Sequence, residues 1–295
     1  MINNTYIQKI EMPDAKIQGI SVSVFRLDLI HPVVSGNKIF KLKYYIDDAI
    51  KNGKQLITFG GPYSNHLVAT AYAAQHAGLN SIGYVRGEKP TVLSDTLKDC
   101  TAYGMQLKFV KRDKYNKLQK ELIQEDNKEI QVIPYGGYGR PGAMGAKKIL
   151  EFEEASQYDI IMASCGSGTM AAGLLTAIHP HQHLLLVSAV KNNFSIEEEI
   201  KALLTEEEYA NKHYTIHHEY HFGGFAKKDE RLVRFMNEFY RDNRIPTDIV
   251  YTGKLAYALN DMLQKGKLPS NSNILLIHSG GLQGNRSLKN NELIF

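Results

Sequence analysis

Residues 159–169 read DIIMASCGSGT, and this stretch contains the repeating unit of the fold. Asp159–Ser164 is a short apolar run with β-branched side chains, which favours a buried strand. The glycines that follow indicate a tight turn, and apolar residues recur at helical spacing from Thr169 onward. A strand that leads through a glycine-rich turn into a helix is typical of α/β proteins with parallel sheets.

The same alternation of strands and helices recurs along the chain, so we expect an α/β fold with parallel sheets flanked by helices. In such sheets ligands bind beyond the carboxyl ends of the strands, so the loops that follow strands are the informative ones. The predicted strands are Gln55–Phe59, Ser81–Arg86, Gln106–Val110, Gln131–Pro134, Asp159–Ser164, Leu184–Val190 and Asn273–His278. The predicted helices are Lys41–Asn52, Leu67–Ala77, Ser94–Tyr103, Pro141–Ser156, Thr169–Ile178, Ser195–Tyr209, Asp229–Asn243 and Lys254–Lys265.

The composition is that of an ordinary globular protein, with 43% hydrophobic and 22% charged residues, and 295 residues are enough for two domains. The net charge is +4, and the densest cationic stretch, Lys111–Lys120, mixes its charges with apolar positions as a solvated helix face does. No nucleic-acid partner is therefore expected.

The chain shows no segment that would direct it to a membrane or to an oxidising compartment. Met1–Ile10 is polar and lacks the apolar stretch of a signal peptide, and no apolar run approaches the ~18 residues that span a bilayer. The two cysteines, Cys100 and Cys165, provide neither a disulfide framework nor metal-ligand spacing. We therefore expect a cytoplasmic protein with no membrane partner.

Gly36-Asn37-Lys38 precedes a predicted amphipathic helix. Gly and Asn favour an irregular backbone, and the helix dipole disfavours a cation at a helix start. Most lysines near a helix start are ordinary surface residues. A lysine held in a cleft, however, can form an imine with an aldehyde, which makes Lys38 a candidate cofactor anchor.

Two more loops lie between a predicted strand and a helix. Ser64-Asn65-His66 presents backbone N–H groups that suit a carboxylate, and Asn65 has an amide that can donate to a ring oxygen; simple helix capping is the alternative. Gly166–Thr169 is suited to a phosphate, because backbone N–H groups converge and the hydroxyls of Ser167 and Thr169 add donors; a tight turn is the alternative.

Two segments, Val250–Lys254 and Ile277–Gly281, each end a strand-like run with a hydroxyl followed by glycine, and a simple turn is the alternative for either. Together with the three loops they resemble 1-aminocyclopropane-1-carboxylate deaminases and D-cysteine desulfhydrases, which are fold-type-II, tryptophan-synthase-β-like enzymes that use pyridoxal phosphate. The resemblance covers nearly the whole chain. Its motifs, in the family's order, are Gly36-Asn37-Lys38 with Lys41-Leu42, Ser64-Asn65-His66, Gly166-Ser167-Gly168-Thr169, Tyr251-Thr252-Gly253-Lys254 and His278-Ser279-Gly280-Gly281.

This resemblance implies that Lys38 carries pyridoxal 5'-phosphate as a Schiff base and acts as a catalytic base. It implies a homodimer and two domains, with the cofactor in the cleft between a larger domain (1–42 and 146–295) and a smaller mobile one (43–145). The other implied roles are catalysis for Ser64 and Tyr251, cofactor binding for Asn65, Gly166, Ser167, Gly168, Thr169 and Thr252, and substrate binding for Ser64, Asn65, His66, Tyr251 and Ser279.

Three positions depart from the pattern of this family. Phe40 stands where arginine is usual, and Tyr63 stands where glutamine is usual. Phe225, within Gly224-Phe225-Ala226, stands where a tyrosine between glycines is expected, so a catalytic hydroxyl is missing. This last departure keeps open a non-catalytic protein that binds or senses pyridoxal phosphate.

The resemblance implies a small amino acid as the substrate, and Thr252 and Ser279 indicate which one. Ring-opening deaminases of the family carry glutamate and leucine at these positions. A neutral Thr252 cannot hold a proton on the pyridine nitrogen as a carboxylate would, which favours prompt loss of a β leaving group. We therefore expect a D-cysteine desulfhydrase that forms pyruvate, sulfide and ammonia, with 1-aminocyclopropane-1-carboxylate deaminase as the alternative.

Two other enzyme classes match short motifs only. Gly137–Gly142 fits the G-x-G-x-x-G of dinucleotide-binding proteins, but the acidic residue expected ~20 positions later is poorly matched. Ser35–Lys38 fits the S-x-x-K of serine acyl-transferases, but the partner motifs are missing.

Overall fold

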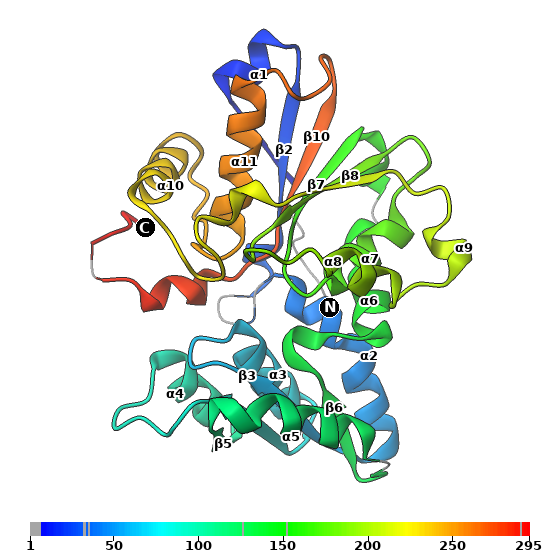
Figure 1. Ribbon diagram of the computed structural model, residues 1–295, viewed down its shortest axis with the longest axis vertical. Coiled ribbons are helices and arrows are strands. Elements are labelled where there is room, and N and C mark those ends of the chain that lie inside the picture. Colours follow the sequence, from blue (N-terminus) through cyan, green and yellow to red (C-terminus); the bar gives the residue numbers. More distant parts are fainter. Residues whose placement is uncertain (1–6, 32–33, 35, 126, 152, 290) are drawn as a thin grey trace.

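The computed structural model describes residues 7–295 except 32–33, 35, 126, 152 and 290. Figure 1 shows two sheets, one above the other, each covered by helices. The upper sheet has six strands in the order β1-β2-β10-β7-β8-β9, and the lower has four in the order β5-β4-β3-β6. Every neighbouring pair is parallel except β1 with β2. The expected α/β fold with parallel sheets flanked by helices is confirmed.

The strands are β1 (Ile7–Ile10), β2 (Ser21–Arg26), β3 (Gln55–Gly60), β4 (Ser81–Arg86), β5 (Gln106–Val110), β6 (Ile130–Ile133), β7 (Ile160–Cys165), β8 (His183–Ser188), β9 (Tyr214–His217) and β10 (Asn273–His278). The α-helices are α1 (Pro13–Ile17), α2 (Asn37–Asn52), α3 (Asn65–His76), α4 (Asp95–Ala102), α5 (Arg112–Gln124), α6 (Arg140–Lys147), α7 (Thr169–Ala177), α8 (Ile196–Lys201), α9 (Glu206–Tyr209), α10 (Glu230–Asn243) and α11 (Thr252–Gln264). Short 3₁₀ turns include η2 (Tyr135–Gly137) and η5 (Glu219–His221).

Helices cover both faces of the six-stranded sheet because its strands bury side chains on both sides. Along β7, Ile161 and Ala163 point into a core shared with α6, α7 and α8. Ile160 and Met162 point to the opposite face, into a core shared with α1, α10 and α11. This two-residue alternation follows from the pleat of a strand, and it explains why β7 reads as a continuous apolar run.

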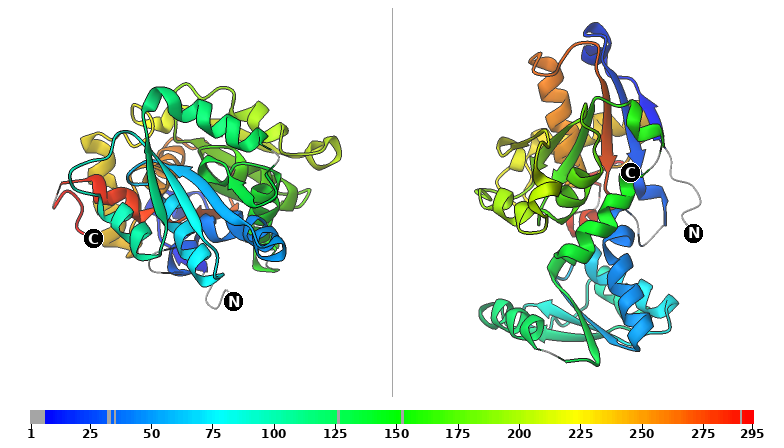
Figure 2. Two further views of the ribbon diagram at one scale, coloured as in Figure 1. Left: turned by 90° about the horizontal axis from the view of Figure 1, so that it is seen from below. Right: turned by 90° about the vertical axis from the view of Figure 1, so that its right-hand side faces the viewer.

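A helical junction of α2, α6 and α7 connects the two sheets. Helix α6 packs on both α2 and α7, and glycines allow the backbones to approach closely. A Cβ added at Gly145 would lie 1.9 Å from the carbonyl oxygen of Phe40, and one added at Gly173 would lie 2.4 Å from that of Ala143. The side view shows this junction along one side of the molecule, between the sheets (Figure 2).

The structure corrects several predicted boundaries. Helix α2 begins at Asn37 rather than at Lys41. The predicted helix Ser195–Tyr209 is divided, because Thr205 starts α9 with a capping box to Glu208. The predicted helix Pro141–Ser156 ends as α6 at Lys147 and continues as 3₁₀ turns.

The strand-like run that ends at Val250 is not a strand; the segment forms a turn before α11. The Asp248 carboxylate shapes this turn by accepting hydrogen bonds from the backbone N–H groups of residues 250–252. Among the described residues, no helix combines the length and the apolar character that crossing a membrane requires.

Candidate active site

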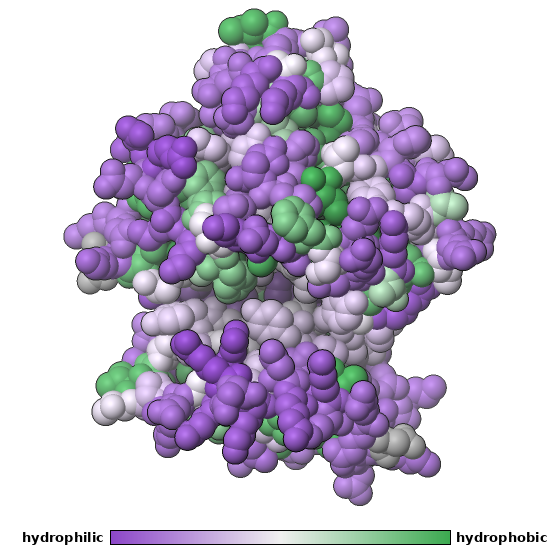
Figure 3. All heavy atoms as spheres, viewed as in Figure 1, coloured by the Kyte–Doolittle hydropathy of each residue, from purple (hydrophilic) through white to green (hydrophobic). Residues whose placement is uncertain are grey.

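The predicted site residues gather where the carboxyl ends of β3, β7 and β10 meet the first turns of α2, α3, α7 and α11. The space-filling view shows that the molecule is hollowed between its two halves at this level (Figure 3). This is the position at which parallel sheets bind ligands.

Lys38 lies in the first turn of α2, against the segment that follows β10. The backbone N–H of Asn37 donates to the carbonyl oxygen of Ser279 at 3.1 Å. Gly36 has a φ of +79°, and a Cβ there would lie 1.9 Å from the same oxygen, so only glycine fits. The Lys38 Nζ donates to the side-chain oxygen of Asn37 at 2.7 Å.

Burial lowers the pKa of Lys38 to about 8, against the opposing negative charge of Asp248. A fraction of this amine is therefore unprotonated near neutral pH, which is the form that attacks an aldehyde.

Lys41, one turn further along α2, is a second buried ammonium group at this site. Its Nζ donates to the carbonyl oxygen of Gly136 at 3.2 Å. Burial and the nearby charge of Lys38 hold the pKa of Lys41 well below its usual value. We did not assign Lys41 a role from the sequence, although its place three residues after Lys38 puts both on one helix face.

The loop after β3 starts α3 and contains two unpaired polar atoms. Ser64 caps the helix, since its hydroxyl oxygen accepts the backbone N–H of Leu67 at 3.3 Å. Asn65 donates to the carbonyl oxygen of Gly281 at 3.3 Å. Its Oδ1, however, is buried without a hydrogen-bond partner. The capping role and a free acceptor therefore coexist in this loop.

His66 is fixed in one tautomer by its neighbour Thr58. The Nε2 of His66 lies 2.8 Å from Thr58 Oγ1. The Thr58 hydroxyl donates its hydrogen bond to the carbonyl oxygen of Ile133 at 3.0 Å. Nε2 must therefore carry a proton, and Nδ1 is a buried acceptor without a partner. Burial and the charges of Lys38 and Lys41 hold the pKa of His66 well below its usual range, so the ring stays neutral.

The loop after β7 turns sharply into α7. Gly168 has a φ of +72°, and the hydroxyls of Ser167 and Thr169 lie 3.1 Å apart. A Cβ at Gly166 would lie 3.1 Å from the ring and hydroxyl of Tyr251, so Tyr251 packs directly over this loop. The first backbone N–H groups of α7 face an end of the helix where an anion is favoured.

Asp248 is a further residue of this site to which the sequence alone gave no role. It is completely buried and accepts four hydrogen bonds, from the backbone N–H groups of Val250, Tyr251 and Thr252 and from the Thr252 hydroxyl. An aspartate a few residues before a helix start is a usable sequence signal for such a cap.

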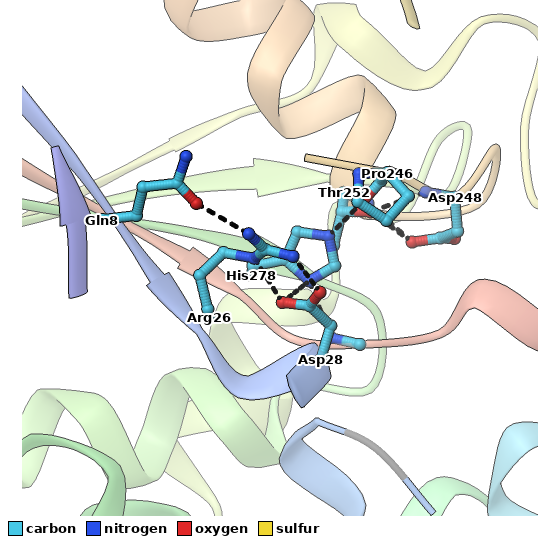
Figure 4. A network of polar contacts seen from close by, with 8 residues as sticks. Gln8, Arg26, Asp28, Pro246, Asp248, Thr252 and His278 are labelled. Atoms are coloured by element: carbon cyan, nitrogen blue, oxygen red, sulfur yellow. Dashed lines mark hydrogen bonds and ion pairs between the residues drawn. The ribbon is translucent and has the colours of Figure 1, made fainter. Parts of the chain in front are cut away.

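A second buried polar network supports the segment that carries Ser279. Arg26, at the end of β2, donates to both oxygens of Asp28 at 2.8 and 2.7 Å and to Gln8 at 2.7 Å. The Nδ1 of His278 lies 3.2 Å from Asp28, and its Nε2 donates to the carbonyl oxygen of Pro246 at 2.7 Å. Figure 4 shows this chain of contacts reaching from β1 to the turn that contains Asp248.

The three departures from the family pattern lie in different environments. Phe40 is buried in the core beside α6 and α7. Tyr63 is 47% exposed, as is Phe225. The Phe225 ring meets the Tyr251 ring edge to face, with centroids 6.0 Å apart. Phe225 therefore contacts a predicted site residue.

The other motif-based alternatives gain no support from these positions. Gly142 packs against its surroundings, since a Cβ there would lie 2.1 Å from the carbonyl oxygen of Gly137. Ser35, which would be the nucleophile of an S-x-x-K site, lies outside the described residues.

Comparison with known proteins agrees with this geometry. Residues 4–280 match the family model described as "Pyridoxal-phosphate dependent enzyme". A putative 1-aminocyclopropane-1-carboxylate deaminase of Thermotoga maritima is 30% identical, over 90% of both chains. A bifunctional mitochondrial D-cysteine desulfhydrase/1-aminocyclopropane-1-carboxylate deaminase of Arabidopsis thaliana is 27% identical, over 90% of this chain and 73% of its own.

Among solved structures, a crystal structure of an ACC deaminase homologue superposes with a TM-score of 0.78 and 26% identity, covering 96% of this chain and 91% of that one. The match to the family model spans the strands of both sheets, from β1 to β10. The chain therefore belongs to the family of pyridoxal-phosphate dependent enzymes, in the group that contains 1-aminocyclopropane-1-carboxylate deaminases and D-cysteine desulfhydrases.

Proposed function

We propose that this enzyme is a lyase that eliminates the thiol of D-cysteine, with Lys38 as the residue that binds the cofactor covalently. The observation that carries the proposal is the amine of Lys38, whose pKa is lowered to about 8 within a set of loops suited to an anion. One water is consumed overall, since D-cysteine and water give pyruvate, sulfide and ammonia.

The residues present fit pyridoxal phosphate. The turn at Gly166–Thr169 and the N-terminus of α7 offer backbone N–H groups to the phosphate. The unpaired Oδ1 of Asn65 and Nδ1 of His66 are buried acceptors that require a donor. Lys41 adds a second buried amine on the same helix face as Lys38.

When bound, pyridoxal phosphate acts as an electron sink for the bond that breaks at Cα. Lys38 is then the base for the Cα proton, a role that general-base groups perform with gains of ~10²–10⁴-fold. Burial raises the pKa of Tyr251 well above its usual value, so its phenol keeps its proton and acts as a hydrogen-bond donor. Ser64 and Ser279 contribute hydroxyls for the substrate.

The choice of D-cysteine rests on Thr252 and Ser279. Both are hydroxyl residues where ring-opening members of the group carry glutamate and leucine, so the pocket lacks an apolar wall for a cyclopropane. A thiolate also leaves more readily than a carbon. The alternative is 1-aminocyclopropane-1-carboxylate, since the Arabidopsis relative is named for both activities.

A panel of five substrates tests this proposal: D- and L-cysteine, D- and L-serine, and 1-aminocyclopropane-1-carboxylate, with keto acid and sulfide as readouts. We expect sulfide and pyruvate from D-cysteine and much slower 2-oxobutanoate from the cyclopropane. Fast 2-oxobutanoate formation without sulfide would reverse the choice. Turnover of none of the five, with the cofactor bound, would favour the non-catalytic alternative that Phe225 keeps open.

We further propose that residues 43–145 form a smaller domain that moves over the cofactor. Three hydrophobic clusters support this division, because all of their buried members except Val34 and Leu42 come from residues 45–133. A homodimer in the cytoplasm completes the proposal, and light scattering of the purified protein measures the oligomeric state.

A further inference from the structure

Lys254, in the first turn of α11, is completely buried, and its hydrogen bonds go to carbonyl oxygens only. Its Nζ donates to Ala189 at 3.3 Å, to His221 at 2.9 Å and to Gly224 at 2.8 Å. An ammonium group removed from water is costly unless its hydrogen bonds are replaced. These three carbonyls replace them, as the oxygen ligands of a bound monovalent cation do.

The ammonium remains mostly protonated at neutral pH. Burial lowers the pKa of Lys254 to about 8, and the negative charge of Asp248 opposes the shift. Lys254 is therefore a cation with a fixed position, provided by the chain itself.

The three carbonyls belong to two separate segments of the chain. Ala189 directly follows β8, whereas His221 and Gly224 lie at the two ends of one turn after β9. The backbone of this turn is left-handed at Phe222 (φ +51°), and it is left-handed again at Ala226 (φ +54°). Residues with a Cβ rarely adopt this conformation, so the turn needs contacts that hold it.

The turn carries Phe225, the residue that meets Tyr251 at the substrate side of the site. Tyr251 directly precedes α11, three residues before Lys254. The Lys254 side chain therefore connects two segments. One is the start of α11, next to Tyr251, and the other is the turn next to Phe225.

We propose that Lys254 is a positioning residue: as a tethered cation it fixes the 221–224 turn, and so sets how closely the Phe225 ring approaches Tyr251. The contact between the two rings defines one wall of the substrate pocket. This contribution to substrate selection rests on the proposed function, whereas the cation–carbonyl contact does not.

A tryptophan reporter tests the position of the turn without substrate or cofactor. The chain contains no tryptophan, so Phe225→Trp introduces a single indole. In this background we compare Lys254→Met, which keeps the length of the side chain but cannot donate, with Lys265→Met, a matched change at the exposed end of α11. Lys265 donates to the side chain of Asp261 and to none of the three carbonyls that accept from Lys254.

We expect red-shifted indole emission and acrylamide quenching raised about twofold or more in Lys254→Met, because the turn loses its link to α11. His221 and Gly224 then keep only the backbone donors Gly224 and Lys227, which lie within the turn itself. The Lys265→Met spectrum should match the parent. Identical spectra for both variants would overturn the proposal.

Chemical rescue tests whether the cation itself is required. Lys254→Ala removes the equivalent of n-propylammonium, so adding n-propylammonium should restore the parental emission, whereas n-propanol should not. If Lys254→Ala fails to fold, refolding with n-propylammonium should recover it. Lys254→Gln replaces the cation by an uncharged donor. If this variant folds and has the emission of the parent, a cation is not required.

The substrate side is measured separately in chains that retain Phe225. We expect Lys254→Met to raise KM for the turned-over amino acid by about tenfold with a smaller change in kcat, since the reacting groups remain. Absence of activity in the parent would count against the proposed function and leave the fluorescence result standing. A shifted spectrum with unchanged KM would remove the claim about substrate selection.

Discussion

Thr252 and Asp248 exchange two hydrogen bonds: the Thr252 hydroxyl donates to Asp248 Oδ2 at 2.6 Å, and the backbone N–H of Asp248 donates back to the same hydroxyl oxygen at 2.7 Å. The hydroxyl proton is thereby committed to a carboxylate, a strong charge-assisted contact. Thr252 retains a lone pair to offer a ligand. If Thr252 faces the pyridine nitrogen, we expect it to act there only as a neutral acceptor, which holds a ring proton much more weakly than the carboxylate of the ring-opening enzymes would.

Replacing Asp248 tests how much of the site depends on this carboxylate. Asp248→Asn puts an amide donor among four buried donors, and we expect it to lower the free energy of unfolding by about 3 kcal/mol. Asp229→Asn is the matched control, because Asp229 caps α10 at the surface and Asn caps equally well. Urea denaturation measures both, and equal small losses would contradict a special role for Asp248.

The covalent link to the cofactor is tested at Lys38. We expect the visible absorbance of the bound cofactor to disappear in Lys38→Ala and to persist in Lys43→Ala, since Lys43 is an exposed residue of α2 paired with Asp47. Borohydride followed by peptide mapping should find the cofactor on Lys38. A label on Lys41 or Lys254, the other buried lysines here, would refute the assignment.

The lowered pKa of Lys38 predicts how stability changes with pH in the cofactor-free protein. The folded pKa is about 8 and the unfolded value is 10.5, so the unfolded chain binds more protons between these values. The free energy of unfolding should therefore rise with pH across this window. Lys38→Met should reduce the rise when urea denaturation of the variant and the parent is compared from pH 7.5 to 9.5, because the two proteins share every other titrating side chain. An unchanged slope would show that Lys38 has an ordinary pKa.

The phosphate-binding role of the loop after β7 is tested at Gly168. Alanine there must adopt a φ of +72°, with its Cβ 3.0 Å from Ile200. We expect Gly168→Ala to purify with little cofactor. Gly104→Ala is matched for strain, because Gly104 has a φ of +78° and nothing within 4 Å of an added Cβ. Full cofactor content in both variants would place the phosphate elsewhere, with Gly137–Gly142 the next candidate.

The missing hydroxyl is tested by Phe225→Tyr. The ring already meets Tyr251, so a phenol oxygen there adds a proton donor at the substrate side, and we expect turnover to rise by about tenfold or more. Phe194→Tyr, at another exposed aromatic, should change nothing. Keto-acid release from D-cysteine and from 1-aminocyclopropane-1-carboxylate measures the effect. Equal rates for Phe225 and its tyrosine variant would show that the hydroxyl is unnecessary.

The sequence predicts β7 and β10 well because both are apolar runs that end in glycine-containing turns. It fails for β2, where Ser23 and Arg26 are buried in a sheet interior. Arg26 is acceptable there only because Asp28 pairs with it and His278 completes the network from a distant strand. Such pairing across the chain has no local signal, whereas the capping by Asp248 is local and could have been recognised.

The predicted loops meet at one place because parallel strands align their carboxyl ends. What the residue types could not reveal was their electrostatic state. The lowered pKa values of Lys38, Lys41 and His66 arise first from burial and, for Lys41 and His66, also from nearby lysine charges. Both causes are properties of the folded molecule.

The position of β10 constrains how the chain can fold during synthesis. It is the last strand made, yet it lies between β2 and β7 in the middle of the six-stranded sheet. On the ribosome, the four-stranded sheet can form early, since its strands lie within residues 55–133. The edges of β2 and β7 that pair with β10 stay unpaired until residues 273–278 have been made. Exposed edges of this kind recruit other strands, so nascent chains should depend on chaperones until β10 emerges.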